Sequence, residues 1–176
     1  MKYFTPQLLG RVRSANEAVA AKALVDWDQA ITRSQRRWQK IKTAVPKNVR
    51  RFEADTVCLH AAQVLSMGRR SELFVLVAET EPPRQELVIL TFFLDKEPLI
   101  EQADLVDRST TGFVMWLYEE WDLDRRGNCR FDLLLSNGWV LKLRYRDFQY
   151  LVVQRIRPAA NGRAARNSSH AVLRSA

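Results

Sequence analysis

The chain has 176 residues, of which 47% are hydrophobic, which is enough for one core and too little for two large domains. Its formal net charge is +8, and the position of this charge is more informative than its total. The longest apolar run, at 87–94, is too short to span a membrane. Residues 1–6 lack the apolar core of a secretory signal, so we expect a cytoplasmic protein.

A long helix is predicted before residue 46. Ser14 to Glu17 has the pattern of a capping box, in which a serine and a glutamate satisfy N–H groups where a helix begins. Pro46 ends the long helix and opens a second, short helix that runs to about Asp55. Apolar or small residues recur every three or four positions along the long helix, at Val19, Ala23, Trp27, Ile31, Ser34, Trp38, Ile41 and Val45.

After residue 56 the apolar period changes to two, which indicates strands. The predicted strands are 57–66, 72–79, 85–94, 98–105, 113–122, 129–135, 139–146 and 148–156, of which 98–105 is the weakest. Residues 67–70 are expected to form a turn. This pattern predicts an α+β fold, in which the long amphipathic helix and the short helix pack on an antiparallel sheet of about six to eight strands.

We expect a single α+β domain over residues 1–156, with the helices within 6–55 and the sheet within 57–156. Residues 157–176 have no apolar period and cannot offset the entropy cost of ordering, so they are predicted to form a disordered basic tail.

The turn at 136–138 predicts the register of its hairpin. A two-residue loop would set Leu133 opposite Lys142 and mix the two faces of the sheet. A three-residue loop with Gly138 in the left-handed region sets Leu133 opposite Leu141 instead, which keeps apolar residues on one face. We therefore predict the three-residue loop.

Positive charge is concentrated between residues 33 and 51. The eight basic residues there, with no acid among them, are Arg33, Arg36, Arg37, Lys40, Lys42, Lys47, Arg50 and Arg51. Basic residues four apart on a helix repel each other by about 0.2–0.5 kcal/mol per pair unless an acidic partner relieves them. Four interpretations of the basic face remain open: a face that is simply solvated, or one that meets a nucleic acid, an acidic protein or the chain's own acids. The candidates for binding a polyanion or a protein partner are Arg33, Arg36, Arg37, Lys40, Arg50 and Arg51.

The chain's own acids are concentrated around Trp121, at Glu119, Glu120, Asp122 and Asp124. Paired carboxylates can act as acid and base or bind a divalent cation. Because neighbouring strand residues point to opposite faces, Glu119 and Glu120 should not converge on one substrate. A solvated edge or a protein contact is the favoured interpretation.

His60 is the only histidine before the tail, and a metal site would need further ligands that the spacing does not supply. A polar site made of His60, Glu119, Glu120 and Asp122 is the candidate for a hydrolase or metal enzyme, but a structural histidine is favoured. We therefore expect no bound metal. We also expect no cofactor, because no phosphate-binding glycine loop is present among six glycines. The cysteines, Cys58 and Cys129, are expected to be free thiols.

Several short motifs carry a resemblance: the opening Met1-Lys2-Tyr3-Phe4-Thr5-Pro6, the basic helix with its tryptophans, Leu59-His60-Ala61, and Ser136-Asn137-Gly138 followed by 144–148. They resemble small bacterial proteins of an uncharacterised family, a domain of unknown function. The pattern has an acid after the histidine, whereas this chain has Ala61. The resemblance implies a bacterial cytoplasmic origin and implies no activity.

The hypothesis that follows is a non-enzymatic binding or interaction module. The alternatives are a binder of the nucleic-acid backbone that uses the basic helix 33–51, and a hydrolase or metal enzyme that uses His60 and nearby carboxylates. The partner could be an acidic protein or a nucleic acid, no membrane is expected, and the sequence leaves the oligomeric state open.

Overall fold

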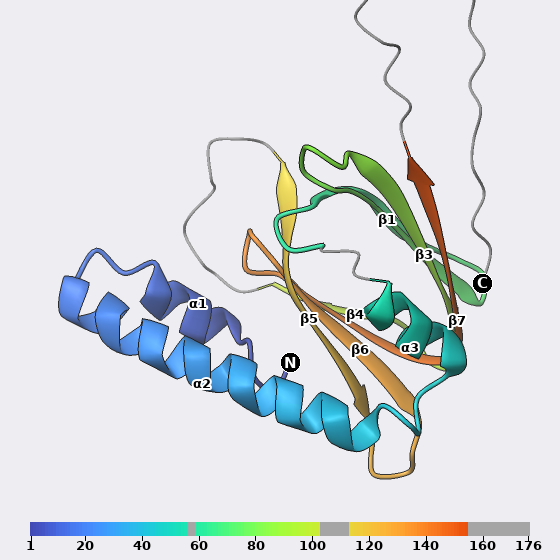
Figure 1. Cartoon of the computed structure of the whole chain (residues 1–176), viewed down its shortest axis with the longest axis horizontal. Helices are drawn as coiled ribbons and strands as arrows, with labels where there is room; N and C mark the ends of the chain where they lie inside the picture. The colour runs from blue at the N-terminus through green and yellow to red at the C-terminus, as the bar shows by residue number, and fades with distance from the viewer. Residues whose placement is uncertain (56–58, 103–112, 155–176) are drawn as a thin grey trace, which may run out of the picture.

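The structure is a computed structural model that describes residues 1–55, 59–102 and 113–154, shown in Figure 1. Helices precede strands along this part of the chain. The helices are α1 (Pro6–Val12), α2 (Glu17–Ile41) and α3 (Lys47–Ala54). The strands are β1 (Gln63–Arg70), β2 (Leu73–Glu79), β3 (Glu86–Leu94), β4 (Leu99–Glu101), β5 (Val114–Leu123), β6 (Cys129–Leu135) and β7 (Val140–Gln154). The predicted tail lies outside the described residues.

The strands form one antiparallel sheet of seven, in the order β3-β2-β1-β5-β6-β7-β4. Strand β3 also pairs with β7, and this pairing closes six of the strands into a barrel. The short strand β4 adds to the first half of β7. The α+β class and the antiparallel sheet are confirmed, whereas the closure into a barrel was not predicted.

Strand β7 makes the closure possible because it is long enough to pair with two neighbours. Its first half pairs with β6 and its second half with β3. The register changes where Phe93 pairs with Asp147 and Leu94 with Tyr145, so Arg146 is bulged out. The sequence predicted two strands, 139–146 and 148–156, because this bulge interrupts the alternation. A bulge bends a strand without ending it.

The β6–β7 hairpin has the predicted three-residue loop. Leu133 pairs with Leu141, and Phe131 pairs with Leu143. Gly138 has a φ of 82°, a left-handed conformation that favours glycine. The hydrophobic alternation of the two strands therefore predicted the register correctly.

The first strand was predicted wrongly. Strand β1 begins at Gln63, and Leu59–Ala62 instead forms a turn in which Ala61 has a φ of 65°. The predicted turn at 67–70 belongs to β1, which pairs with β2 up to Arg70. The glycine and the charges there gave a false turn signal because this part of β1 is exposed on the surface.

Helix α2 begins at Glu17 and ends at Ile41, so it is shorter than predicted at both ends. Its N-cap is Asn16, whose side chain accepts hydrogen bonds from two backbone N–H groups, at 3.1 and 3.2 Å. Ser14 accepts a bond from the N–H of Asn16 instead. Helix α3 follows as predicted, with Pro46 at its N-cap.

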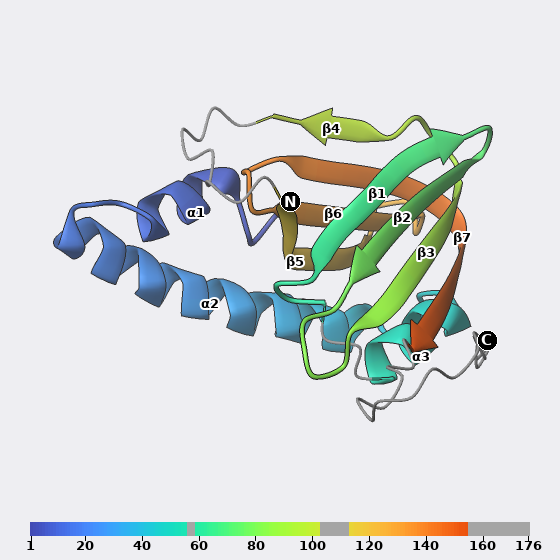
Figure 2. The ribbon, with the colours of Figure 1, turned by 90° about the horizontal axis from the view of Figure 1, so that it is seen from above.

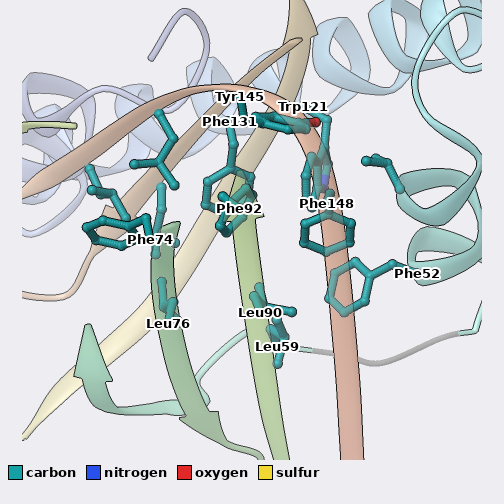
Figure 3. Close-up of a cluster of buried hydrophobic side chains, with 14 of the residues drawn as sticks. Phe52, Leu59, Phe74, Leu76, Leu90, Phe92, Trp121, Phe131, Tyr145 and Phe148 are labelled. Atoms are coloured by element: carbon teal, nitrogen blue, oxygen red, sulfur yellow. The ribbon is translucent and has the colours of Figure 1, made fainter. Parts of the chain in front are cut away.

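The barrel interior forms the main core. Aromatic side chains from several strands meet there, and Figure 3 shows Phe52 pointing from α3 toward Phe148. The Phe52 ring lies 5.6 Å from that of Phe148 and 6.0 Å from that of Trp121. Helix α3 is therefore anchored to the barrel by its apolar face.

A second cluster fixes α1 and α2 to the outer face of β5 and β6. Phe4 stacks on Tyr118 with the ring centroids 4.4 Å apart, and Ala23 is fully buried. Val19, predicted to face the core, is 39% exposed because the first half of α2 extends beyond the sheet (Figure 2). The second half of α2 lies along β5 and carries four of the basic candidates from the sequence, Arg33, Arg36, Arg37 and Lys40.

Candidate functional site

The basic face of α2 forms one side of a groove. We call this groove, of about 510 Å³, the basic groove, and its lining residues are Lys2, Tyr3, Arg33, Arg36, Arg37 and Lys40. No acid lines it. The structure therefore brings four of the six predicted basic candidates together and adds Lys2, which the sequence analysis did not identify.

Three of the α2 residues in the basic groove are free to meet a partner. Arg33, Arg36 and Lys40 are exposed, as predicted from the helical wheel. The guanidinium of Arg33 donates to the amide oxygen of Gln29 at 3.1 Å, which leaves its charge unneutralised. Within the described part of the chain, none of the three forms a salt bridge. Lys2 is exposed in the same groove, with its Nζ 5.3 Å from the centre of the Tyr3 ring.

Arg37 has a different role, because it joins α2 to β5. Its Nε donates to Asp122 Oδ1 at 2.6 Å, and a second guanidinium nitrogen donates to the carbonyl of Leu123 at 3.2 Å. The acids around Trp121 therefore do meet the basic helix, but among the described residues they do so through this single pair. Arg33, Arg36 and Lys40 keep their charge for another partner.

A second groove, of about 750 Å³, continues from the first and shares Lys2 and Arg37 with it. Its further basic residues are Lys96, Arg125, Arg126, Arg130 and Arg144. Its two acids are already engaged, Asp122 with Arg37 and Asp124 with Arg144 at 2.9 Å. Hydrogen bonds from Asn128 lower the pKa of Asp124 to about 2, so this carboxylate stays charged and fixed in its turn. The combined surface is strongly cationic.

Arg50 and Arg51 lie apart from the basic groove. Both are exposed on α3, and neither lines the groove. Arg51 is close enough to Tyr150 of β7 to interact electrostatically with its hydroxyl. These two predicted candidates therefore do not belong to the same binding surface.

The adjacent acids Glu119 and Glu120 point to opposite sides of β5, as predicted. The Glu120 carboxylate accepts hydrogen bonds from the backbone N–H groups of Lys2, Tyr3 and Phe4, at 2.7, 2.7 and 2.9 Å. These bonds hold the N-terminal segment against β5. Glu120 is thus a structural residue that places Lys2 at the edge of the basic groove.

Glu119 faces the barrel side, where it meets Glu53 of α3. Trp116 Nε1 donates to Glu119 Oε2 at 2.6 Å. Burial raises the pKa of Glu119, and burial together with the nearby Glu119 raises the pKa of Glu53 to about 7. Glu53 is therefore partly protonated at neutral pH. An interaction with the Trp121 indole opposes the rise at Glu53, although that pair does not reach hydrogen-bond geometry.

Both carboxyls open into a cleft of about 540 Å³ between α2, α3 and β5, which we call the carboxyl cleft. Trp38 and Trp121 line it with Glu53 and Glu119, and Tyr3, Arg36 and Arg37 line both this cleft and the basic groove. Trp121 is 7% exposed, and its indole N–H has no hydrogen-bond partner among the described residues. The two hollows are therefore neighbours, one cationic and one carrying carboxyls.

Glu53 was missed by the sequence analysis. The signal was present, because Glu53 follows Val49 by four residues and therefore shares its helix face. Val49 is fully buried, so an acid on that face is drawn into the fold. Burying a carboxylate on the apolar side of a short helix costs free energy unless a partner or a ligand compensates its charge.

His60 is exposed in the turn before β1. Its Nδ1 lies 2.7 Å from the carbonyl oxygen of Leu117, so the ring donates its proton there, and the ring packs 4.9 Å from that of Tyr118. The described residues contain no group of three or more potential metal ligands. Electrostatic interaction with His60 lowers the pKa of Glu119, so these two members of the predicted polar site lie near each other, and a role for His60 in a site stays a prediction.

Comparison of the chain with protein-family models, with curated proteins and with solved structures gave no match. Among the described helices, none has both the length and the apolar character that crossing a membrane requires. Cys129 is a free thiol, whereas Cys58 lies outside the described residues.

Proposed function

We propose that this chain is a non-enzymatic binding module that holds a nucleic acid by its phosphate backbone in the basic groove. The observation that carries the proposal is the row of exposed cations on one side of α2 that have no ion-pair partner in the described part of the chain. Arg33, Arg36 and Lys40 follow one another over about 10 Å of helix, at the 1.5 Å rise of each residue. Lys2 faces them across the groove.

A repeating polyanion explains this arrangement better than a solvated face does. Like charges one helical turn apart repel each other. Within the described ranges, Arg37 is the one cation of the basic groove that an acid neutralises. Guanidinium groups bind phosphate oxygens in a fork of two hydrogen bonds, so Arg33 and Arg36 suit a phosphate backbone. The second groove extends the same charge over the β5–β6 turn, which lengthens the track for a polymer.

Charge reversal tests the proposal. Arg33, Arg36 and Lys40 are changed to Glu together, and binding of a labelled mixed-sequence single strand of about 16 nucleotides is followed by fluorescence anisotropy. The variant should bind at least about tenfold more weakly, because three phosphate contacts are lost. Its melting temperature should stay close to the original, since these side chains are exposed.

The matched control reverses Lys42, Lys47 and Arg50, which are equally exposed and change the net charge by the same amount. None of these three lines the basic groove, so the control should keep most of the affinity. Equal losses in both variants would refute the groove as the site. Binding of polyglutamate in place of the oligonucleotide would refute the nucleic acid in favour of an acidic protein.

A further inference from the structure

Tyr3 places an aromatic ring in the basic groove. Among the described residues that line this groove, Tyr3 is the one aromatic, and the other five are cations. Its side chain is half-buried, and the exposed side chain of Lys2 lies over one face of the ring, with Nζ 5.3 Å from the ring centre. Because the side chain over that face is exposed and flexible, the face is turned toward the groove rather than toward the core.

The backbone holds this ring in a fixed place. The N–H of Tyr3 donates to Glu120 Oε1 at 2.7 Å, and the N–H of Phe4 donates to the same oxygen at 2.9 Å. Phe4 itself is 3% exposed and stacks on Tyr118. A ring that is already held loses little conformational entropy when a flat ligand stacks on it, so less of the binding free energy is lost.

The ligand must suit both the ring and the charge around it. In the described part of the chain, four cations of the groove, Lys2, Arg33, Arg36 and Lys40, have no ion-pair partner. An acidic peptide satisfies these cations and makes no use of the ring, whereas an uncharged aromatic molecule satisfies the ring and not the cations. A nucleotide offers a phosphate beside a flat base. Proteins that bind single strands combine a cationic groove with aromatic rings in this way.

We infer that Tyr3 stacks on a base of the strand whose backbone lies in the basic groove, so that the bound segment is single-stranded. The Lys2 ammonium moves from the ring to a phosphate, and the base takes its place. A cation over an exposed ring is held more weakly than a stacked base, so this exchange is favourable. In a duplex each base is already stacked between its neighbours and cannot reach Tyr3. The inference rests on the proposed function and adds the strandedness.

Strands with and without bases test the inference. A labelled mixed-sequence DNA strand of about 16 nucleotides is compared with a strand of equal length made of abasic sites, by fluorescence anisotropy at fixed salt. Both strands carry the same phosphates, so the ratio of their affinities reports on the bases. The strand with bases should bind about tenfold more tightly, as expected for one stacked base.

Three variants locate the stacked base. Tyr3→Leu should bring the ratio close to one, because it removes the ring and leaves the cations, whereas Tyr3→Phe keeps the ring and should keep the ratio. The control, Phe113→Leu, removes an exposed aromatic that does not line the basic groove, and it should also keep the ratio. A ratio within one variant is not obscured by a change in overall affinity. Tyr3→Leu should leave the affinity for a duplex of the same sequence unchanged.

Equal affinities of the original chain for the two strands would overturn the inference and leave the proposed function standing. Binding of neither strand would overturn both. A ratio that survives Tyr3→Leu, with or without a loss of overall affinity, would show that no base stacks on this ring. A loss of duplex affinity as large as the loss for the single strand would overturn the assignment of a single-stranded ligand.

Discussion

Replacing Glu53 with glutamine should remove much of the pH dependence of stability between about pH 4.5 and 7. Burial and the neighbouring Glu119 raise the pKa of Glu53 from 4.5 to about 7. In this window the folded state holds a proton that the unfolded state has lost, so the free energy of unfolding falls as the pH rises and levels off above about pH 7.

The magnitude follows from the two pKa values. At about 1.4 kcal/mol for each pKa unit, the difference between 4.5 and about 7 sets a ceiling of about 3 kcal/mol. Glu53 is partly open to the cleft, so we expect about 2 kcal/mol. Glutamine imitates the protonated carboxyl, and the variant should therefore be more stable than the original chain at pH 8 and similar to it at pH 5.

Urea unfolding at pH 5, 6, 7 and 8, followed by tryptophan fluorescence, measures this difference. Glu81→Gln is the matched control, because its side chain is exposed and its pH profile should follow that of the original chain. Parallel profiles for Glu53→Gln and the original chain would refute the assignment of a buried carboxyl to Glu53.

Three further outcomes follow from the structure. Glu120→Ala should lower the free energy of unfolding by about 3 kcal/mol in urea titrations, because three backbone N–H groups lose a charged acceptor, and a loss below about 1 kcal/mol would contradict this. Asn16→Ala should cost about 1 kcal/mol and Ser14→Ala clearly less, since Asn16 is the N-cap of α2, and equal costs would favour the capping box. In a Cys58→Ser background, Cys129 should react slowly with thiol reagents at pH 8 until the protein unfolds, because burial raises the pKa of its thiol, and rapid labelling of the folded chain would disprove that.

The sequence predicted local structure better than it predicted the closure of the sheet into a barrel. Alternation placed Leu133 opposite Leu141 because strand period and turn chemistry act within a few residues. The barrel depends on the pairing of β3 with β7 across distant parts of the chain and on the bulge at Arg146. A bulge breaks the alternation that a pattern search relies on, so one long strand was predicted as two.

The residues of the candidate site also fall into two groups, those that a local sequence pattern predicts and those that only the tertiary fold brings together. Helical periodicity alone placed Arg33, Arg36 and Lys40 on the exposed face of α2. Lys2 joins them because contacts such as the hydrogen bond from its backbone N–H to Glu120 hold the N-terminal segment against β5, which no local pattern shows. Glu53 lies against Glu119 because α3 packs over the barrel, and that arrangement is a property of the tertiary fold.

The salt dependence of oligonucleotide binding tests recognition of the phosphate backbone most directly. The exposed cations of the basic groove that have no described ion-pair partner are Lys2, Arg33, Arg36 and Lys40. Neutralising about four phosphates of a single strand gives a slope of about −3 in a plot of log affinity against log salt concentration. Affinity should then fall about 50-fold between about 50 and 200 mM salt. A slope between zero and about −1, or an affinity that does not change with salt, would contradict binding of the backbone in this groove.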